Sequence, residues 1–224
     1  MTRMPTAISW SVALLLGLAA LGCAPGGVGD PCTPEDEYQQ YFNGFQVTET
    51  NVESRSFQCE TRLCLVNHFQ GRVSCRLGQS APPLDAMGKP IGGPDYHPSC
   101  PIPGTATSTD PTSENNVNVE VKPQLQKRQT DKAVYCSCRC DGPDKNARYC
   151  ECPQGFQCEQ LVSDLKIISQ GGQLAGSYCI RSGSKYDPNG DGSDSGPTCA
   201  DNKKACGCDG TNPPDECGKQ ATMP

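Results

Sequence analysis

The stretch VYCSCRC at residues 134–140 decides the fold. A strand with this alternation places Val134 and its three cysteines on one face and the intervening residues on the other. The turn residues DGPD follow at 141–144, and YCEC at 149–152 repeats the alternation, which predicts a returning strand. GSYCI at 176–180 predicts a last strand. We therefore expect a small all-β fold, rich in disulfides and loops, made of short antiparallel hairpins or a meander with little helix in the mature chain.

Other segments predict short elements around this centre. Valines alternate with polar residues over 117–121, which is the period of a half-buried strand. Two apolar runs within 63–75 flank a turn-like stretch at 67–71 and predict a hairpin. Residues 161–169 predict a short helix. The aromatic residues expected to form a small core in the first region are Phe42, Phe45 and Phe57.

Cysteines two residues apart on one strand point the same way and lie about 6.5 Å from each other, too far to bond easily. Each is therefore expected to form a disulfide with another segment. Cys-x-Cys spacing also suits a thiolate site for a soft metal, which is the alternative interpretation. The cysteines expected in disulfides are Cys32, Cys59, Cys64, Cys75, Cys100, Cys136, Cys138, Cys140, Cys150, Cys152, Cys158, Cys179, Cys199, Cys206, Cys208 and Cys217.

These cysteines fall into three even sets along the chain. Four lie within 32–75, eight within 100–179 and four within 199–217. Loop closure costs more entropy as loops lengthen, so local bonding is favoured. We expect three self-contained disulfide groups, with Cys100 recruited by the central one.

The N-terminus carries a short positive region and then an apolar run at 7–21, which is shorter than the roughly 20 residues of a membrane-spanning helix. The run ends in ALGC at 20–23, which resembles the lipobox of bacterial lipoproteins. The resemblance implies a signal peptide cleaved before Cys23, lipid on Cys23 as a membrane anchor and, from Ala24, sorting to the outer membrane. Ordinary secretion and an uncleaved anchor are the alternatives. Lipidation of Cys23 also leaves an even number of the 17 cysteines for pairing.

Composition predicts a loop-rich chain with little core for its length. Hydrophobic residues make up 35% and aromatic residues 6%, beside 24 Gly and 20 Pro, so disulfides are expected to hold the domains together. The organisation expected is a signal peptide at 1–22, a lipidated tether at 23–31, a small four-cysteine module at 32–79, a Pro/Gly/Ser/Thr linker at 80–115, a cysteine-rich β meander at 116–186, an Asp/Gly linker at 187–198 and a four-cysteine tail at 199–224.

Charge and side-chain chemistry argue against two classes of function. The net charge of −6 and the scattered basic residues disfavour a nucleic-acid partner. The basic pairs at 127–128 and 203–204 are expected to be solvated surface. His68 and His97 are not in metal-ligand spacing, and DSG at 194–196 lies in a linker without a matching histidine motif. We expect a protein that is not an enzyme.

Three short segments carry partial signals of binding. CECPQGFQC at 150–158 resembles the end of an epidermal-growth-factor-like module, which implies protein binding. Residues 199–217 are similar to the middle of Kazal-type protease inhibitors, which implies an inhibitory loop with Asp201 at the specificity position. The oxygen-bearing residues that begin an EF-hand-like calcium loop are Asp187, Asn189 and Asp191. Ca²⁺ is the one cofactor that the sequence suggests.

These observations favour a non-enzymatic, lipid-anchored cell-envelope protein whose disulfide-stapled body is a binding or structural module. The expected partners are the membrane, through the anchor, and an envelope or extracellular protein or polymer. The expected location is the outer membrane or the cell surface. The alternatives are a calcium-stabilised adhesin-like module and a degenerate Kazal-like inhibitor tail.

Overall fold

The computed structural model of the chain describes residues 26–91, 98–106, 108, 110, 112–163, 174–189 and 196–208. Its fold is small and all-β, rich in loops and disulfides, as the cysteine pattern predicts. Within these ranges no helix is both long and apolar enough to cross a bilayer. The elements are η1 (Glu35–Tyr38), β1 (Thr50–Glu53), β2 (Leu63–Asn67), α2 (Thr130–Ala133), β3 (Val134–Ser137), β4 (Arg139–Asp141), β5 (Phe156–Val162), β6 (Gly176–Arg181) and η3 (Lys203–Cys206).

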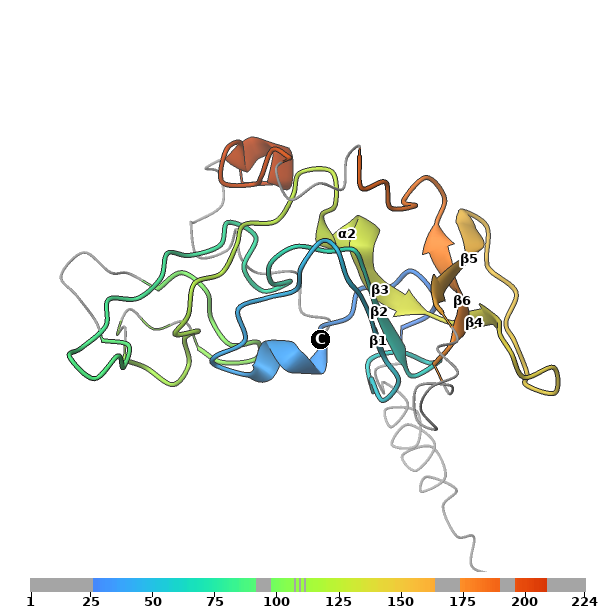
Figure 1. The fold of residues 1–224 in the computed structure, drawn as a ribbon, viewed down its shortest axis with the longest axis horizontal. Helices are drawn as coiled ribbons and strands as arrows, with labels where there is room; N and C mark the ends of the chain where they lie inside the picture. The colour runs from blue at the N-terminus through green and yellow to red at the C-terminus, as the bar shows by residue number, and fades with distance from the viewer. Residues whose placement is uncertain are drawn as a thin grey trace, which may run out of the picture.

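The strands form two antiparallel sheets, one in the order β1-β2-β3 and the other in the order β4-β6-β5. In Figure 1 both sheets lie at one end of the long axis, while the described loops between β2 and α2 extend to the other end. The stretch 134–140 feeds both sheets, because β3 ends at Ser137 and β4 begins at Arg139. This single segment therefore joins the two sheets covalently.

The alternation predicted for 134–140 is confirmed on the first sheet. Val134 and Cys136 point into a core cluster on one face, together with Phe45 and Phe69. Tyr135 points to the opposite face, where a second cluster joins the two sheets. That second cluster contains Leu65, Tyr135, Tyr178 and Ile180. Both faces of the first sheet are thus buried, which explains how a chain poor in aromatic residues builds a core.

The last strand is also confirmed, as β6, but two predicted pairings are wrong. The hairpin expected within 63–75 does not form, because β2 pairs with β1 on one side and with β3 on the other. Gly71 instead exchanges two backbone hydrogen bonds with Phe45. The returning strand expected at 149–152 is likewise absent, and β4 pairs with β6. Periodicity identified the strand at 63–66 but not its partners, and it wrongly predicted strands at 72–75 and 149–152.

Three further predictions, for residues 117–121, Phe57 and residues 161–169, differ from the structure or are only partly described by it. Val117 and Val121 are buried as predicted, yet 117–121 is not a regular strand and makes only an isolated bridge from Val121 to Gln79. Phe57 is not part of the core: it is 82% exposed, with the Arg62 guanidinium 4.5 Å from its ring centre. Of the helix expected at 161–169, residues 161–162 belong to β5, residue 163 is outside any helix or strand, and the rest lies outside the described residues.

Every cysteine within the described ranges is disulfide-bonded, including Cys208. The seven pairs with both partners described are Cys32–Cys64, Cys59–Cys136, Cys75–Cys100, Cys138–Cys150, Cys140–Cys158, Cys152–Cys179 and Cys199–Cys206. Disulfides of this density are typical of proteins that fold outside the cytoplasm. Each cysteine of the CSCRC stretch bonds to another segment, as the strand geometry predicts.

The prediction of three self-contained disulfide groups is wrong. Cys59 bonds to Cys136 across 77 residues, and Cys75 bonds to Cys100, so two bridges join the first set to the central one. The physical reason is the pairing of β2 with β3, which places residues 63–66 beside residues 134–137. Sheet formation has already closed the long loop, so the entropic preference for local bonding no longer decides the partner.

A buried ion pair fixes the loops next to the first sheet. Arg72 and Glu37 are both fully buried, with 3.8 Å between guanidinium and carboxylate. Arg72 also donates to the Phe42 carbonyl at 2.7 Å, while the Glu37 carboxylate accepts from the backbone and hydroxyl of Ser74 at 3.0 and 2.7 Å. Burial raises the pKa of Glu37, and Arg72 together with these hydrogen bonds opposes the rise. The pair therefore ties η1 to the loop after β2.

Candidate functional site

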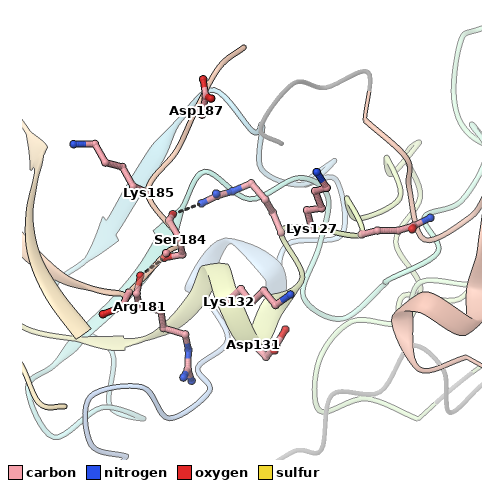
Figure 2. Close-up of a pocket in the computed structure, with 11 residues that line it drawn as sticks. Lys127, Asp131, Lys132, Arg181, Ser184, Lys185 and Asp187 are labelled. Atoms are coloured by element: carbon pink, nitrogen blue, oxygen red, sulfur yellow. Dashed lines mark hydrogen bonds between the residues drawn. The ribbon is translucent and has the colours of Figure 1, made fainter. Parts of the chain in front are cut away.

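An open pocket of about 750 Å³ lies between two segments that are distant in sequence. One wall is residues 126–132, which lead into α2, and the other is residues 181–187, which follow β6 (Figure 2). The charged lining residues are mostly basic. The cations are Lys127, Arg128, Lys132, Arg181 and Lys185, and the carboxylates are Asp131 and Asp187. The lining residues alone carry three more positive than negative charges, in a chain whose net charge is −6, and one of these cations, Lys185, is paired with Glu159 outside the lining.

Arg128 holds the two walls together. Its side chain is only 5% exposed. The guanidinium donates to the carbonyls of His68 at 2.6 Å, Asn67 at 2.8 Å and Ser184 at 3.2 Å. The bond to Ser184, drawn in Figure 2, reaches the opposite wall of the pocket. Arg128 is therefore a structural cation whose charge remains close to the pocket.

An aromatic stack extends this junction. The His68 and Tyr186 rings are parallel, 3.8 Å apart between centres, and Arg128 lies 5.7 Å from the centre of the Tyr186 ring. His68 Nδ1 is 2.9 Å from the Val47 carbonyl, and its Nε2 is 3.2 Å from the Thr50 hydroxyl. A neutral imidazole fits both contacts, donating from Nδ1 and accepting at Nε2.

The pKa of His68 agrees with a neutral ring. Burial lowers this pKa, the hydrogen bond to Val47 opposes the decrease, and the charge of Arg128 adds to it. His68 occupies the left-handed backbone region, with φ of 51°, directly after β2. The stack is therefore a neutral support for the 181–187 wall.

Arg181 anchors the start of that wall. Its guanidinium donates to the Gly29 carbonyl at 2.9 Å and lies 5.4 and 5.2 Å from the ring centres of Tyr135 and Phe156. Its backbone N–H donates to the Tyr135 hydroxyl at 3.0 Å. The Ser184 hydroxyl then bonds back to the Arg181 carbonyl at 2.8 Å, which closes the turn. Both walls are thus fixed before any ligand binds.

The lysines are the exposed cations of the pocket lining. Lys127 and Lys132 are exposed on one wall, and Figure 2 shows the Lys132 side chain beside Asp131. Lys185, on the other wall, forms an ion pair of 2.5 Å with Glu159, and its amine points away from Lys132. Exposed ammonium groups on rigid walls suit carboxylate or phosphate groups of a ligand, with little reorganisation of the backbone.

The pocket was missed at the sequence level, where residues 127–128 were expected to be solvated surface. That prediction is wrong for Arg128, which is buried, although Lys127 is exposed. The lysines at 203 and 204 are exposed, as expected. No local signal marks Arg128, because its carbonyl acceptors come from residues about 60 positions away.

The residues predicted to bind calcium are described only in part. Asp187 lines the pocket, and its carboxylate accepts from the Asn189 backbone N–H at 2.9 Å, while Asp191 lies outside the described residues. Calcium binding by this loop stays a prediction. Cys23, where lipidation is predicted, also lies outside the described residues, as do Cys217 and His97.

The Kazal-like and growth-factor-like segments have well-defined local contacts. The Asp201 carboxylate accepts from the backbone and hydroxyl of Thr198 at 2.7 and 2.8 Å, and these bonds lower its pKa. The side chain at the expected specificity position is thus engaged within its own loop. Cys150, Cys152 and Cys158 each bond to a cysteine outside 150–158.

Comparisons with protein-family models, with curated proteins and with solved structures find no match for this chain. The residues of the pocket are therefore the guide to its function.

Proposed function

We propose that this chain is a non-enzymatic, exported binding module, held at the membrane by lipid on Cys23, and that its basic pocket binds an acidic polymer of the cell envelope. The observation that supports this best is the concentration of cations around one preformed pocket in an acidic chain. A ligand with repeated carboxylate or phosphate groups complements that charge, and the negative remainder of the surface favours orientation with the pocket toward the polymer.

The rigid walls explain why the disulfide frame matters for such a function. Arg128 and Arg181 use their hydrogen bonds on backbone carbonyls, so they shape the pocket, while the exposed lysines contact the ligand. Disulfide Cys152–Cys179 ties β6, which leads into the 181–187 wall, to the loop before β5, and Cys140–Cys158 ties β5 to β4. A wall that is already ordered loses little conformational entropy on binding.

The test is binding of the oxidised protein to polygalacturonate, a carboxylate polymer, with neutral dextran as the control ligand. The variant Lys127→Glu/Lys132→Glu reverses two charges at the pocket. We expect it to weaken binding roughly tenfold at low ionic strength, with the parent affinity itself falling as salt is added. The matched control is Lys203→Glu/Lys204→Glu, which makes the same charge change on η3, outside the pocket lining.

The two variants separate a specific site from general electrostatic attraction. Equal weakening by both would mean that only net charge matters and would contradict the pocket as the site. Binding to dextran as strong as binding to polygalacturonate would contradict an acidic ligand. Membrane release of a Cys23→Ser variant tests the lipid anchor separately.

A further inference from the structure

Six cysteines in and beside the second sheet gather their sulfurs into one continuous cluster. The sulfurs of Cys140, Cys152 and Cys158 lie within 4.8 Å of one another, and so do those of Cys138, Cys150 and Cys179. The disulfide Cys152–Cys179 contributes one sulfur to each group. Three disulfides are therefore linked side by side through the middle one.

The contacts inside this cluster are close. Cys179 Sγ lies 3.6 Å from Cys138 Sγ and 3.7 Å from Cys150 Sγ, although Cys138 and Cys150 are bonded to each other. These separations are near the 3–3.5 Å at which reacting atoms are poised for attack. Because all six sulfurs are in disulfides, the cluster holds no thiolate for a soft metal in this oxidised state.

The cluster is most open to solvent at one end. Cys158 on β5 is exposed, and Cys140 and Cys152 are half-buried. At the other end Cys179 is fully buried, Cys138 is 5% exposed and Cys150 is half-buried. An external thiolate therefore reaches Cys158 most easily, while buried Cys138 and Cys179 are reached through their neighbours.

We infer that the cluster is a thiol–disulfide exchange site that accepts electrons from a dithiol at Cys158 and passes one of the two resulting thiols inward along the three disulfides. A thiolate of the dithiol attacks Cys158 Sγ, breaks the Cys140–Cys158 bond and releases the Cys140 thiolate. The second thiol of the reductant, once deprotonated, then attacks its own sulfur in the mixed disulfide and leaves as a cyclic or linked disulfide. Cys140 and Cys158 are now thiols, and the dithiol has been oxidised by two electrons.

The inward steps conserve electrons. The Cys140 thiolate attacks Cys152 Sγ, which forms Cys140–Cys152, breaks Cys152–Cys179 and releases the Cys179 thiolate. That thiolate attacks Cys138 or Cys150, forms a new bond to one of them and releases the other. Each step breaks one S–S bond, forms one, consumes one thiolate and produces one. The result is one thiol that remains at Cys158 and one that moves inward, in a chain with otherwise intact disulfides.

A second sulfur group in the molecule provides an internal control. The sulfurs of Cys32, Cys59 and Cys136 also lie within 4.8 Å of one another, but all three residues are buried, at 2% exposure or less. The same limit on the sulfur separations holds here, but only two disulfides take part and none of the three cysteines is exposed. This group should therefore stay oxidised under conditions in which the open cluster exchanges.

The experiment treats the fully oxidised chain with one equivalent of dithiothreitol and maps free thiols by N-ethylmaleimide labelling and mass spectrometry. Samples quenched at once should carry the label on Cys140 and Cys158. Samples first held without oxygen at pH 8, where thiolates form, should carry it increasingly on Cys138, Cys150, Cys152 or Cys179, with a Cys140–Cys152 or Cys158–Cys152 linked peptide. Samples held at acidic pH should keep the label on Cys140 and Cys158, because few thiolates form there.

The variant Cys152→Ser/Cys179→Ser removes the middle disulfide and should confine the label to Cys140 and Cys158 at all times. If this variant does not fold, the time course of labelling in the parent chain still shows whether thiols move inward. Label that stays on Cys140 and Cys158 at pH 8 would overturn the exchange site, and so would first labelling of the Cys32–Cys64 or Cys59–Cys136 pair. Polymer binding by the pocket is a separate property, measured on the oxidised chain.

Discussion

In both sheets, two cysteines face each other on neighbouring strands without bonding to each other. In the first sheet the pair is Cys64 and Cys136, and in the second it is Cys158 and Cys179. Both members of the first pair are fully buried, whereas Cys158 is exposed. The same local arrangement therefore supports the core in one sheet and remains accessible to external thiols in the other.

The surroundings of the two sheets also differ in their access to solvent. Beside the first sheet, Arg72 and Glu37 satisfy each other and nearby backbone groups without access to water. Beside the second sheet, Arg128 bonds to the 181–187 wall, and exposed lysines line the open pocket. The first region carries stability and the second carries the candidate chemistry, so changes in each should have different consequences.

The largest expected effect comes from the buried ion pair. Glu37→Gln leaves the Arg72 charge buried without a counter-charge, which should lower the free energy of unfolding by about 3–5 kcal/mol. Denaturant unfolding with disulfides intact measures this loss. The control is Glu35→Gln on the same short helix, where the side chain is exposed and a change of only about 0.5 kcal/mol is expected. A similar small change at Glu37 would show that the pair does not fix η1.

A smaller effect distinguishes the disulfides of the two sheets. Removing Cys59–Cys136 opens a loop of 77 residues and removing Cys140–Cys158 opens one of 18. The chain-entropy relation assigns these bonds about 4.5 and about 3.2 kcal/mol. The double alanine variant of the first pair should therefore be less stable by about 1 kcal/mol, measured by thermal or denaturant unfolding without reductant. The reverse order would contradict the stabilising role assigned to the first sheet.

The smallest effect concerns pH at the junction between the sheets and the pocket. Because the pKa of His68 lies below its ordinary 6.5 in the folded chain, the unfolded chain takes up the proton first as pH falls. His68 therefore contributes stability that is present above pH 6.5 and is lost as pH decreases through the range between 6.5 and its lower folded pKa.

His68→Asn removes this titration with a residue that tolerates the left-handed backbone at φ of 51°. The melting temperature of the parent should decrease more steeply between pH 7 and pH 5 than that of the variant. Parallel pH profiles would mean that the imidazole is not the titrating group. The comparison of the two profiles also cancels the contribution of carboxylates common to both chains.

The sequence predicts the kind of fold better than its connections. Alternation at 134–140 and at 176–180 correctly marks β3 and β6, since the period of two is a property of the strand itself. The partners of Cys59 and Cys75 were not predictable in this way, because they depend on which strands meet in a sheet. Cysteine counting gives the number of bonds and leaves their pairing open.

The candidate site was still less predictable. Arg72 and Arg128 are charged residues in unremarkable local sequence, and their burial depends on carbonyls and a carboxylate supplied by distant segments. When the hydrogen-bond and ion-pair partners of a buried charge come from distant segments, no local sequence pattern marks that charge. The basic pocket follows from Arg128, so it too is visible only once the two walls are brought together.

The most direct test of this account is disulfide mapping of the native, oxidised protein by proteolysis at acidic pH, where exchange is suppressed, followed by mass spectrometry. The structure predicts linked peptides that contain Cys59 with Cys136 and Cys75 with Cys100, which interlock the first and central regions. Linkages confined to separate sets, such as Cys59 with Cys75, would contradict the fold, the walls of the pocket and the sulfur cluster together.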